Sequence, residues 1–173
     1  VMIYLTDTVG LNSGIVGTLM AVAKIFDGIS DVIFGALIDK TKTKMGKARP
    51  WMLWPYLGCG VCLFAIFAIP TSWGLVAKYA FFLIFYVMLN AVFYTANNIA
   101  YSALTALITK NENERVQLGS IRFVFAFTTS TIIQAVTFGL VEHFGNDAAA
   151  WKIVALIYVV IGIISNTISV LSM

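Results

Sequence analysis

The 173-residue chain is 60% hydrophobic and only 11% charged, with a mean hydropathy of +0.92. Because a soluble domain carries about 25% charged residues, this composition excludes an ordinary soluble domain and predicts a membrane protein. The net charge is only +3 and the basic residues are clustered, which argues against a nucleic-acid-binding surface.

The chain begins with a short apolar run, Val1–Leu5, which we interpret as the end of a first membrane helix in a fragment of a longer protein. Five longer apolar stretches follow, and each reaches the ~20 residues that cross about 30 Å of hydrocarbon. These stretches cover about residues 12–38, 50–69, 75–108, 116–141 and 151–173. The predicted fold is therefore all-α, a polytopic helical membrane protein with six helices inferred in residues 1–173.

The distribution of lysine and arginine predicts the orientation of these helices. Two turns on one side hold seven basic residues, whereas the turns on the other side hold only Lys78 and Lys152. The seven are Lys40, Lys42, Lys44, Lys47, Arg49, Lys110 and Arg115. By the positive-inside rule, loops 39–50 and 110–115 are expected to face the cytoplasm in a multi-pass protein of the cell membrane.

The first long stretch carries three ionisable residues, Lys24, Asp27 and Asp31, near its middle. In a helix they fall within a sector of roughly 60°. Inserting them costs about 9 kcal/mol, and the apolar side chains of the span return only about 5 kcal/mol. This helix is therefore expected to need a bundle around it.

A stripe of small residues runs beside the charged sector, one every seven positions, and predicts close approach of a neighbouring helix. Its members are Gly14, Ala21, Gly28 and Gly35. The charged sector itself has two interpretations. Lys24 and one aspartate form a structural ion pair, or the excess negative charge marks a site for a cation or a proton, because intramembrane carboxylates indicate function.

The stretch 75–108 has a polar face that spans an arc of roughly 160° and has Thr95 at its edge. The face contains Asn90, Tyr94, Asn97, Asn98, Tyr101, Ser102 and Thr105. Hydroxyl groups, amides and aromatic rings suit a sugar, although hydrogen bonds between helices are the alternative. In the next stretch, Arg122 either extends to the cytoplasmic interface or pairs with the aspartates.

Two segments resemble a known family. They are FDGISDVIFGALIDKTKTKMGKARPWMLW, residues 26–54, and NNIAYSALTALITKNENERVQLGSIRF, residues 97–123. Both are similar to segments of the glycoside–pentoside–hexuronide cation symporters, of which the melibiose permease is a member. These symporters belong to the major facilitator superfamily. The resemblance implies twelve helices in two halves, with this chain as most of the amino-terminal half and a carboxy-terminal half as its partner.

The resemblance also implies roles for individual residues. Asp27 and Asp31 match the carboxylates that bind the coupling cation, Na⁺ or H⁺, and Thr95 stands where a hydroxyl can join them. The implied substrate-binding residues are Lys24, Asn97, Asn98, Tyr101 and Arg122. Asn98 replaces an aspartate of the melibiose permease, which argues against a melibiose-like substrate. The acidic sugar-binding residue of the family's first helix would precede Val1.

The basic loop has two interpretations of its own. By resemblance, Asp39, Lys47 and Arg49 belong to a gating loop that holds the cytoplasmic helix ends in one conformation. Alternatively, the loop only sets the topology.

These observations predict cation-coupled transport of a sugar or glycoside by alternating access, with no cofactor beyond the coupling cation and no nucleic-acid partner. A membrane sugar sensor without transport, or an uncoupled facilitator, is the alternative. An enzyme is not expected, because His143 is the only histidine and lies in an outer turn. Cys59 and Cys62 lie in an apolar helix and are interpreted as packing residues.

Overall fold

The structure, a computed structural model, describes residues 1–44 and 46–172. Within these residues every regular element is helical, so the predicted all-α class is confirmed. Two of the elements, η1 and η2, are π-helical. In chain order the elements are η1 Tyr4–Thr8, α1 Ser13–Lys40, α2 Arg49–Phe67, α3 Leu75–Val87, η2 Met88–Tyr94, α4 Thr95–Ile108, α5 Glu112–His143 and α6 Ala148–Leu171.

Four helices of the described residues are long and apolar enough to cross a membrane: α2, the continuous α3–η2–α4 run of 34 residues, α5 and α6. The helix α1 is not among them, although it has 28 residues. Its middle carries Lys24, Asp27 and Asp31, which lower its hydropathy. This agrees with the expectation that α1 depends on its neighbours.

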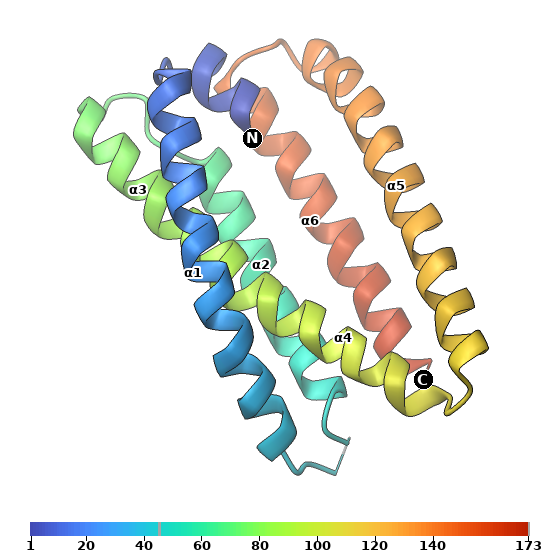
Figure 1. Cartoon of the computed structure of the whole chain (residues 1–173). Helices are drawn as coiled ribbons and strands as arrows, with labels where there is room; N and C mark the ends of the chain where they lie inside the picture. The colour runs from blue at the N-terminus through green and yellow to red at the C-terminus, as the bar shows by residue number, and fades with distance from the viewer. Residues whose placement is uncertain (45, 173) are drawn as a thin grey trace.

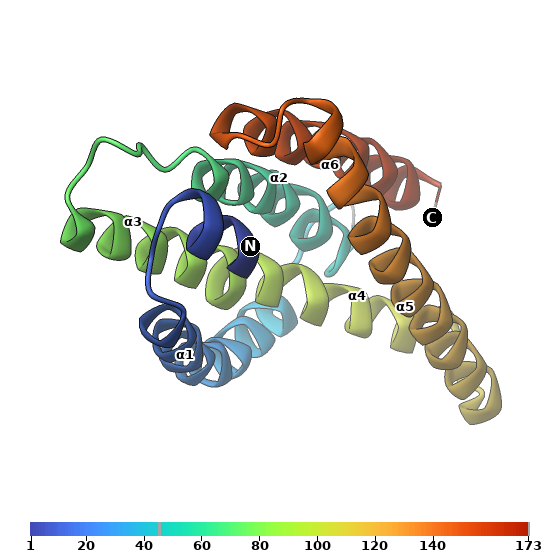
Figure 2. The same cartoon turned by 90° about the horizontal axis from the view of Figure 1, so that it is seen from above.

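The helices run side by side, and the α1–α2 and α4–α5 connections lie at the same end of the bundle (Figure 1). These two connections contain the seven clustered basic residues. The tightest packing joins α2 to α6 and to the η2–α4 run, whereas α5 packs mainly against α6 and, more lightly, against α4. Seen from above, α5 diverges from the other helices along its length (Figure 2). The bundle therefore has a tight part around α2 and a loosely attached α5.

The core at the end of the bundle opposite the basic loops is built on aromatic rings. Tyr4 is fully buried, and its hydroxyl donates to the carbonyl of Phe67 at 2.9 Å. The rings of Phe67 and Trp151 stack with centroids 5.9 Å apart. Nearby, the Tyr79 hydroxyl accepts from the backbone N–H of Asn12 at 2.8 Å, which fixes the start of α1 against α3. Buried aromatic side chains with paired hydroxyl groups stabilise such a core.

Glycines allow α2 to approach its neighbours closely. A Cβ at Gly58 would collide with the ring of Phe93, and one at Gly60 would lie 2.9 Å from Val159. The small-residue stripe predicted on α1 behaves differently. A Cβ at Gly28 or Gly35 would meet no neighbouring atom within 4 Å, so the expectation of close approach there is wrong for the described residues. A stripe of small residues permits close packing but does not specify the partner helix.

Three helices meet at one backbone carbonyl. The side-chain amides of Asn97 in α4 and Asn166 in α6 both donate to the Met52 carbonyl of α2, at 2.7 Å and 3.0 Å. Because a carbonyl oxygen has two lone pairs, it can accept more than one hydrogen bond. Interhelical hydrogen bonds of this kind join neighbouring helices in membranes. Asn97 is thus engaged in helix packing.

This arrangement predicts that Asn97 and Asn166 are energetically coupled, because their amides share the Met52 carbonyl. In the full-length protein, Asn97→Leu is expected to lower the free energy of unfolding by about 1 kcal/mol, the net value of one hydrogen bond. In an Asn166→Leu background the loss should be larger, because Asn97 is then the one described side chain that donates to this carbonyl. Unfolding by SDS in mixed micelles measures the double-mutant cycle.

The matched control for this cycle is Thr105→Val, because the Thr105 hydroxyl donates to Tyr101 in its own helix. Its effect should be small and the same in both backgrounds. An Asn97→Leu cost that is equal with and without Asn166 contradicts the explanation.

Candidate functional site

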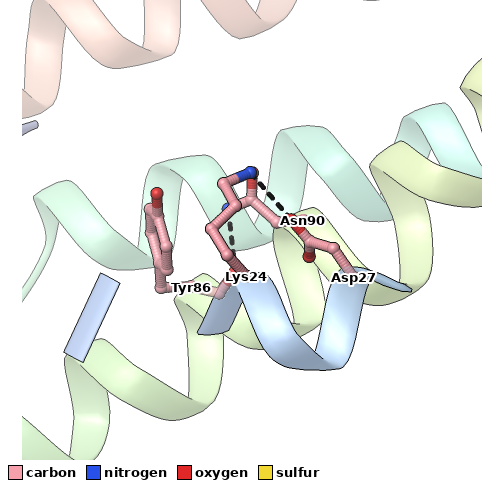
Figure 3. Close-up of polar contacts among 4 residues, drawn as sticks. All are labelled: Lys24, Asp27, Tyr86 and Asn90. Atoms are coloured by element: carbon pink, nitrogen blue, oxygen red, sulfur yellow. Dashed lines mark hydrogen bonds and ion pairs between the residues drawn. The ribbon is translucent and has the colours of Figure 1, made fainter. Parts of the chain in front are cut away.

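The charged residues of α1 form one ion pair. The Lys24 ammonium lies 2.7 Å from Oδ2 of Asp27, and this is the single ion pair within residues 1–44 and 46–172. Figure 3 draws the pair with Tyr86 of α3 and Asn90 of η2, two elements that pack against α1. Asn90 donates its amide to the Tyr86 carbonyl at 3.0 Å. The side of α1 that faces η2 is therefore polar.

The pair leaves one negative charge uncompensated. The second oxygen of Asp27, Oδ1, is buried and has no hydrogen-bond donor among the described residues. Asp31, about one turn further along α1, is exposed and makes no hydrogen bond or ion pair with a described residue. A buried carboxylate oxygen normally has a partner, so this one is open to a positive ligand or a donor. The structural ion pair that we considered is present, but it accounts for only one aspartate.

The residues present here fit a small hard cation in their chemistry. Carboxylate, carbonyl and hydroxyl oxygens are the ligands that such cations prefer. Thr95, the expected hydroxyl ligand, is 5% exposed in α4, which packs against α1, but no hydrogen bond joins it to either aspartate. No group of three or more histidine, cysteine or acidic side chains gathers in the described residues. The acidic ligands at this site are therefore the two aspartates.

Arg122 of α5 contacts the polar face of α4. Its Nη2 donates to Oδ1 of Asn98 at 2.5 Å, and its Nη1 lies 3.5 Å from the Ser102 hydroxyl. The guanidinium carbon lies 4.3 Å from the centroid of the Tyr101 ring, within the range of a cation–π interaction. The expected pairing of Arg122 with the aspartates is therefore wrong for the described residues, because Arg122 instead bridges α5 and α4. Its extension toward the cytoplasmic interface stays a prediction.

A cavity of about 760 Å³ opens beside this bridge. Arg122 and Tyr101 line it together with polar residues of α5, namely Thr129, Ser130 and Gln134. These three follow Arg122 at helical spacing, and this polar pattern along α5 is the signal by which the sequence could have identified them. The cavity combines hydrogen-bond donors, acceptors and an aromatic ring. Such a surface can bind the hydroxyl groups of one ring edge and the C–H groups of its face.

The π-helical segment η2 divides the polar face of the 75–108 stretch among three neighbours. A π-helix turns less per residue than an α-helix, so residues on either side of η2 do not share one face as an unbroken α-helix predicts. Asn90 faces the α1 pair, Asn97 bonds to α2, and Asn98 bonds to Arg122. Asn97 and Asn98 both lie in α4, and their side chains point about 100° apart as adjacent residues of an α-helix do, so they have different partners. Asn98, Tyr101 and Arg122 come together, but Asn97 and Lys24 do not join them.

The predicted gating residues make no ion pair within the described part of the chain. Asp39 lies in the last turn of α1. Arg49 is the first residue of α2, and Lys47 precedes it by two residues. A hydrogen bond joins the two ends of this connection instead. The indole N–H of Trp51 donates to the Thr41 hydroxyl at 2.8 Å. The gating role of Asp39, Lys47 and Arg49 stays a prediction.

Fold and site together define a multi-pass helical membrane protein with an intramembrane acidic pair and a separate polar cavity. A family model described as "MFS/sugar transport protein" matches residues 1–173. The chain therefore belongs to this family of sugar transport proteins within the major facilitator superfamily, and the resemblance to cation symporters of glycosides is confirmed.

Several curated relatives are similar to the chain. It is 35% identical to the isoprimeverose transporter of Lactiplantibacillus pentosus, with 94% of this chain and 34% of the relative covered. It is 35% identical to the inner membrane symporter YicJ of Escherichia coli, with coverages of 84% and 31%. The glucuronide carrier protein homolog of E. coli is 29% identical, with coverages of 73% and 27%. The chain thus spans about a third of the length of the first two relatives.

The bridge between α4 and α5 gives a testable prediction. Arg122→Lys keeps the charge but cannot reach both Asn98 and Ser102 with a planar fork. A loss of about 1 kcal/mol should raise amide hydrogen exchange in the segment around Arg122 about fivefold. Exchange measured by mass spectrometry on the full-length protein in detergent checks this. Lys110→Gln, in the adjacent connection, should leave that exchange unchanged, and equal exchange in Arg122→Lys and the parent protein would exclude the bridge.

Proposed function

We propose that the chain is the amino-terminal part of a symporter that couples the entry of a sugar or glycoside to a cation, Na⁺ or H⁺. The observation that carries the proposal is the buried Oδ1 of Asp27, which has no donor among the described residues, in a member of a sugar-transport family. Asp31 adds a second carboxylate without a partner there. Intramembrane acids of this kind commonly mark ion pathways.

The proposed coupling is electrostatic. With the cation absent, Lys24 neutralises one aspartate and leaves a net negative charge on α1, which opposes withdrawal of this region from water. A cation between Asp27 and Asp31 removes that charge. The region where α1 packs against η2 and α4 can then be withdrawn from water in a closed state of the transporter, and alternating access follows. By thermodynamic linkage, a sugar that favours the closed state must strengthen cation binding by the same factor.

The proposed sugar site is the cavity beside Arg122. The guanidinium has five N–H donors, and the contacts with Asn98 and Ser102 leave others for the hydroxyl groups or carboxylate of a substrate. The ring of Tyr101 offers an apolar surface for a sugar face. In this proposal Lys24 acts on the cation site rather than on the sugar, because its ammonium is paired with Asp27.

The proposed orientation puts the two basic connections on the cytoplasmic side of the cell membrane. Both lie at one end of the bundle (Figure 1). In this orientation Asp39, Lys47 and Arg49 lie where they can hold the cytoplasmic helix ends during gating. The chain matches about a third of the length of its relatives, and the partner half of the proposed transporter lies in the remaining part of that length.

Loss of Asp31 tests the coupling. In the full-length protein, Asp31→Cys is expected to abolish uphill accumulation of sugar, because one carboxylate cannot both balance Lys24 and hold the cation. Uptake into proteoliposomes with and without a Na⁺ gradient, and with and without a proton gradient, measures this for a panel of glycosides, pentoses and uronides.

The matched control is Glu112→Gln, an exposed acid in the first turn of α5. It should accumulate sugar as the parent does. Accumulation that survives in Asp31→Cys rejects the coupling scheme. Sugar exchange that never depends on a gradient in the parent protein indicates an uncoupled facilitator, and binding without exchange indicates a sensor.

Removal of Lys24 gives a second test, in which cation binding is expected to become stronger rather than to be lost. Since Lys24 competes with the coupling cation for Asp27, Lys24→Gln is expected to lower the half-saturating cation concentration several-fold, a change of about 1 kcal/mol for an exposed pair. Lys152→Gln, in α6, is the control. An unchanged or raised half-saturating concentration in Lys24→Gln means that Lys24 does not compete for the site.

A further inference from the structure

A groove lies between α1 and α2 at the end of the bundle that carries the basic connections. Both helices pack against the η2–α4 run, whereas their own backbones stay apart over most of their length and meet through side chains near the basic connection. The gap has a volume of about 330 Å³ and an almost entirely apolar lining. We call it the aromatic groove; its walls include Phe34, Trp51, Trp54, Phe93 and Ala96.

The walls of the aromatic groove are held in place from two sides. Trp51 meets the ring of Phe34 edge to face at 5.9 Å, and its indole N–H is bonded to Thr41. Phe93 sits in the space left by Gly58. Trp54 is 70% exposed and forms the open side. The walls of the groove are therefore held in fixed positions, and one of its aromatic rings, Trp54, is accessible.

The aromatic groove faces away from the proposed sugar site. Ala96 lines the groove, whereas Asn98 contacts Arg122, and two residues along an α-helix are separated by about 200°. No polar side chain of the acidic pair or of the Arg122 bridge lines the groove. Its occupant is therefore expected to be apolar and to come from the membrane rather than from the transport path.

Two basic residues directly precede, in the chain, the residues that line one end of the groove. Arg49 directly precedes Pro50 and Trp51, which both line it, and Lys47 lies two residues earlier. Neither basic side chain has an ion-pair partner in residues 1–44 and 46–172. No described side chain caps the N-terminus of α2, so N–H groups of its first turn also lack a partner of that kind. Free N–H groups at a helix start and basic side chains together favour a phosphate.

We propose that the aromatic groove binds an acyl chain of an anionic phospholipid, with the phosphate at Lys47, Arg49 and the start of α2. Basic pockets between membrane helices bind anionic headgroups in this way. An aromatic belt alone would explain Trp51 and Trp54 but would favour no headgroup charge. The charge of these basic residues distinguishes the two cases, and the proposal does not depend on the transported sugar.

Quenching of tryptophan fluorescence by brominated lipids tests the proposal. The full-length protein is reconstituted in vesicles of phosphatidylcholine with a small fraction of dibrominated phosphatidylglycerol or dibrominated phosphatidylcholine. Bromine quenches only on contact, so brominated phosphatidylglycerol is expected to quench more strongly at equal mole fraction. Trp54→Phe should remove most of this difference, whereas Trp73→Phe, at the opposite end of the bundle, should retain it.

Charge neutralisation gives the decisive comparison. Each of Lys47→Gln and Arg49→Gln should weaken the preference for phosphatidylglycerol about fivefold, the effect of about 1 kcal/mol per basic residue. Lys110→Gln, in the other basic connection, should leave it unchanged. For the unaltered protein, raising the salt from about 0.05 M to about 0.5 M should also reduce the preference.

Three results would overturn the proposal. Equal quenching by both lipids indicates a plain aromatic belt. A preference for phosphatidylglycerol that survives both neutralisations and high salt places the lipid elsewhere. No quenching that depends on Trp54 indicates that another part of the full-length protein covers the groove.

Discussion

The structure depends on one electrostatic constraint: α1 carries more negative than positive charge through the middle of a membrane protein. Lys24 and Asp27 neutralise each other at 2.7 Å, but Asp31 and one oxygen of Asp27 have no such partner among the described residues. Removing an unpaired charge from water costs several kcal/mol. The helix therefore has to keep this sector toward protein or water, which accounts for a polar neighbour such as Asn90 on η2.

The α3–η2–α4 run connects the acidic pair with the Arg122 bridge. Asn90 lies beside the pair, and Asn98, two turns further along the same run, accepts from Arg122. The π-helical geometry between them sets the relative direction of the two amides, and such segments are frequent at functional sites. In the proposed mechanism, a change in the packing of α1 on η2 is transmitted to Asn98 by this continuous helix. Coupling between a cation and a sugar needs such a shared element with two arrangements.

Sequence patterns predicted the helices well, because apolar runs of membrane length have few alternative structures. They also predicted that Asp27 and Asp31 lie on one side of α1. The family resemblance grouped Asn98, Tyr101 and Arg122 with Asn97 and Lys24, and the structure brings together only the first three. They did not predict partners. A helical wheel gives the face of Asn97 but not its partner, the Met52 carbonyl of α2, and it assumes a constant turn that η2 breaks. The glycine stripe of α1 failed for the same reason, since spacing defines a surface and not its occupant.

The loose attachment of α5 has a mechanistic consequence. In the described residues Val141 is its only buried residue, and at its other end Arg115 fixes it to the last carbonyls of α4, donating to Thr109 at 2.8 Å and to Ala106 at 3.0 Å. Between these points the Arg122 bridge is the main polar link to α4. A substrate that competes for the Arg122 donors therefore changes the α4–α5 contact directly, whereas the α2–α6 packing is untouched. Motion during transport is then expected between α5 and the tight part of the bundle, because fewer contacts must be broken there.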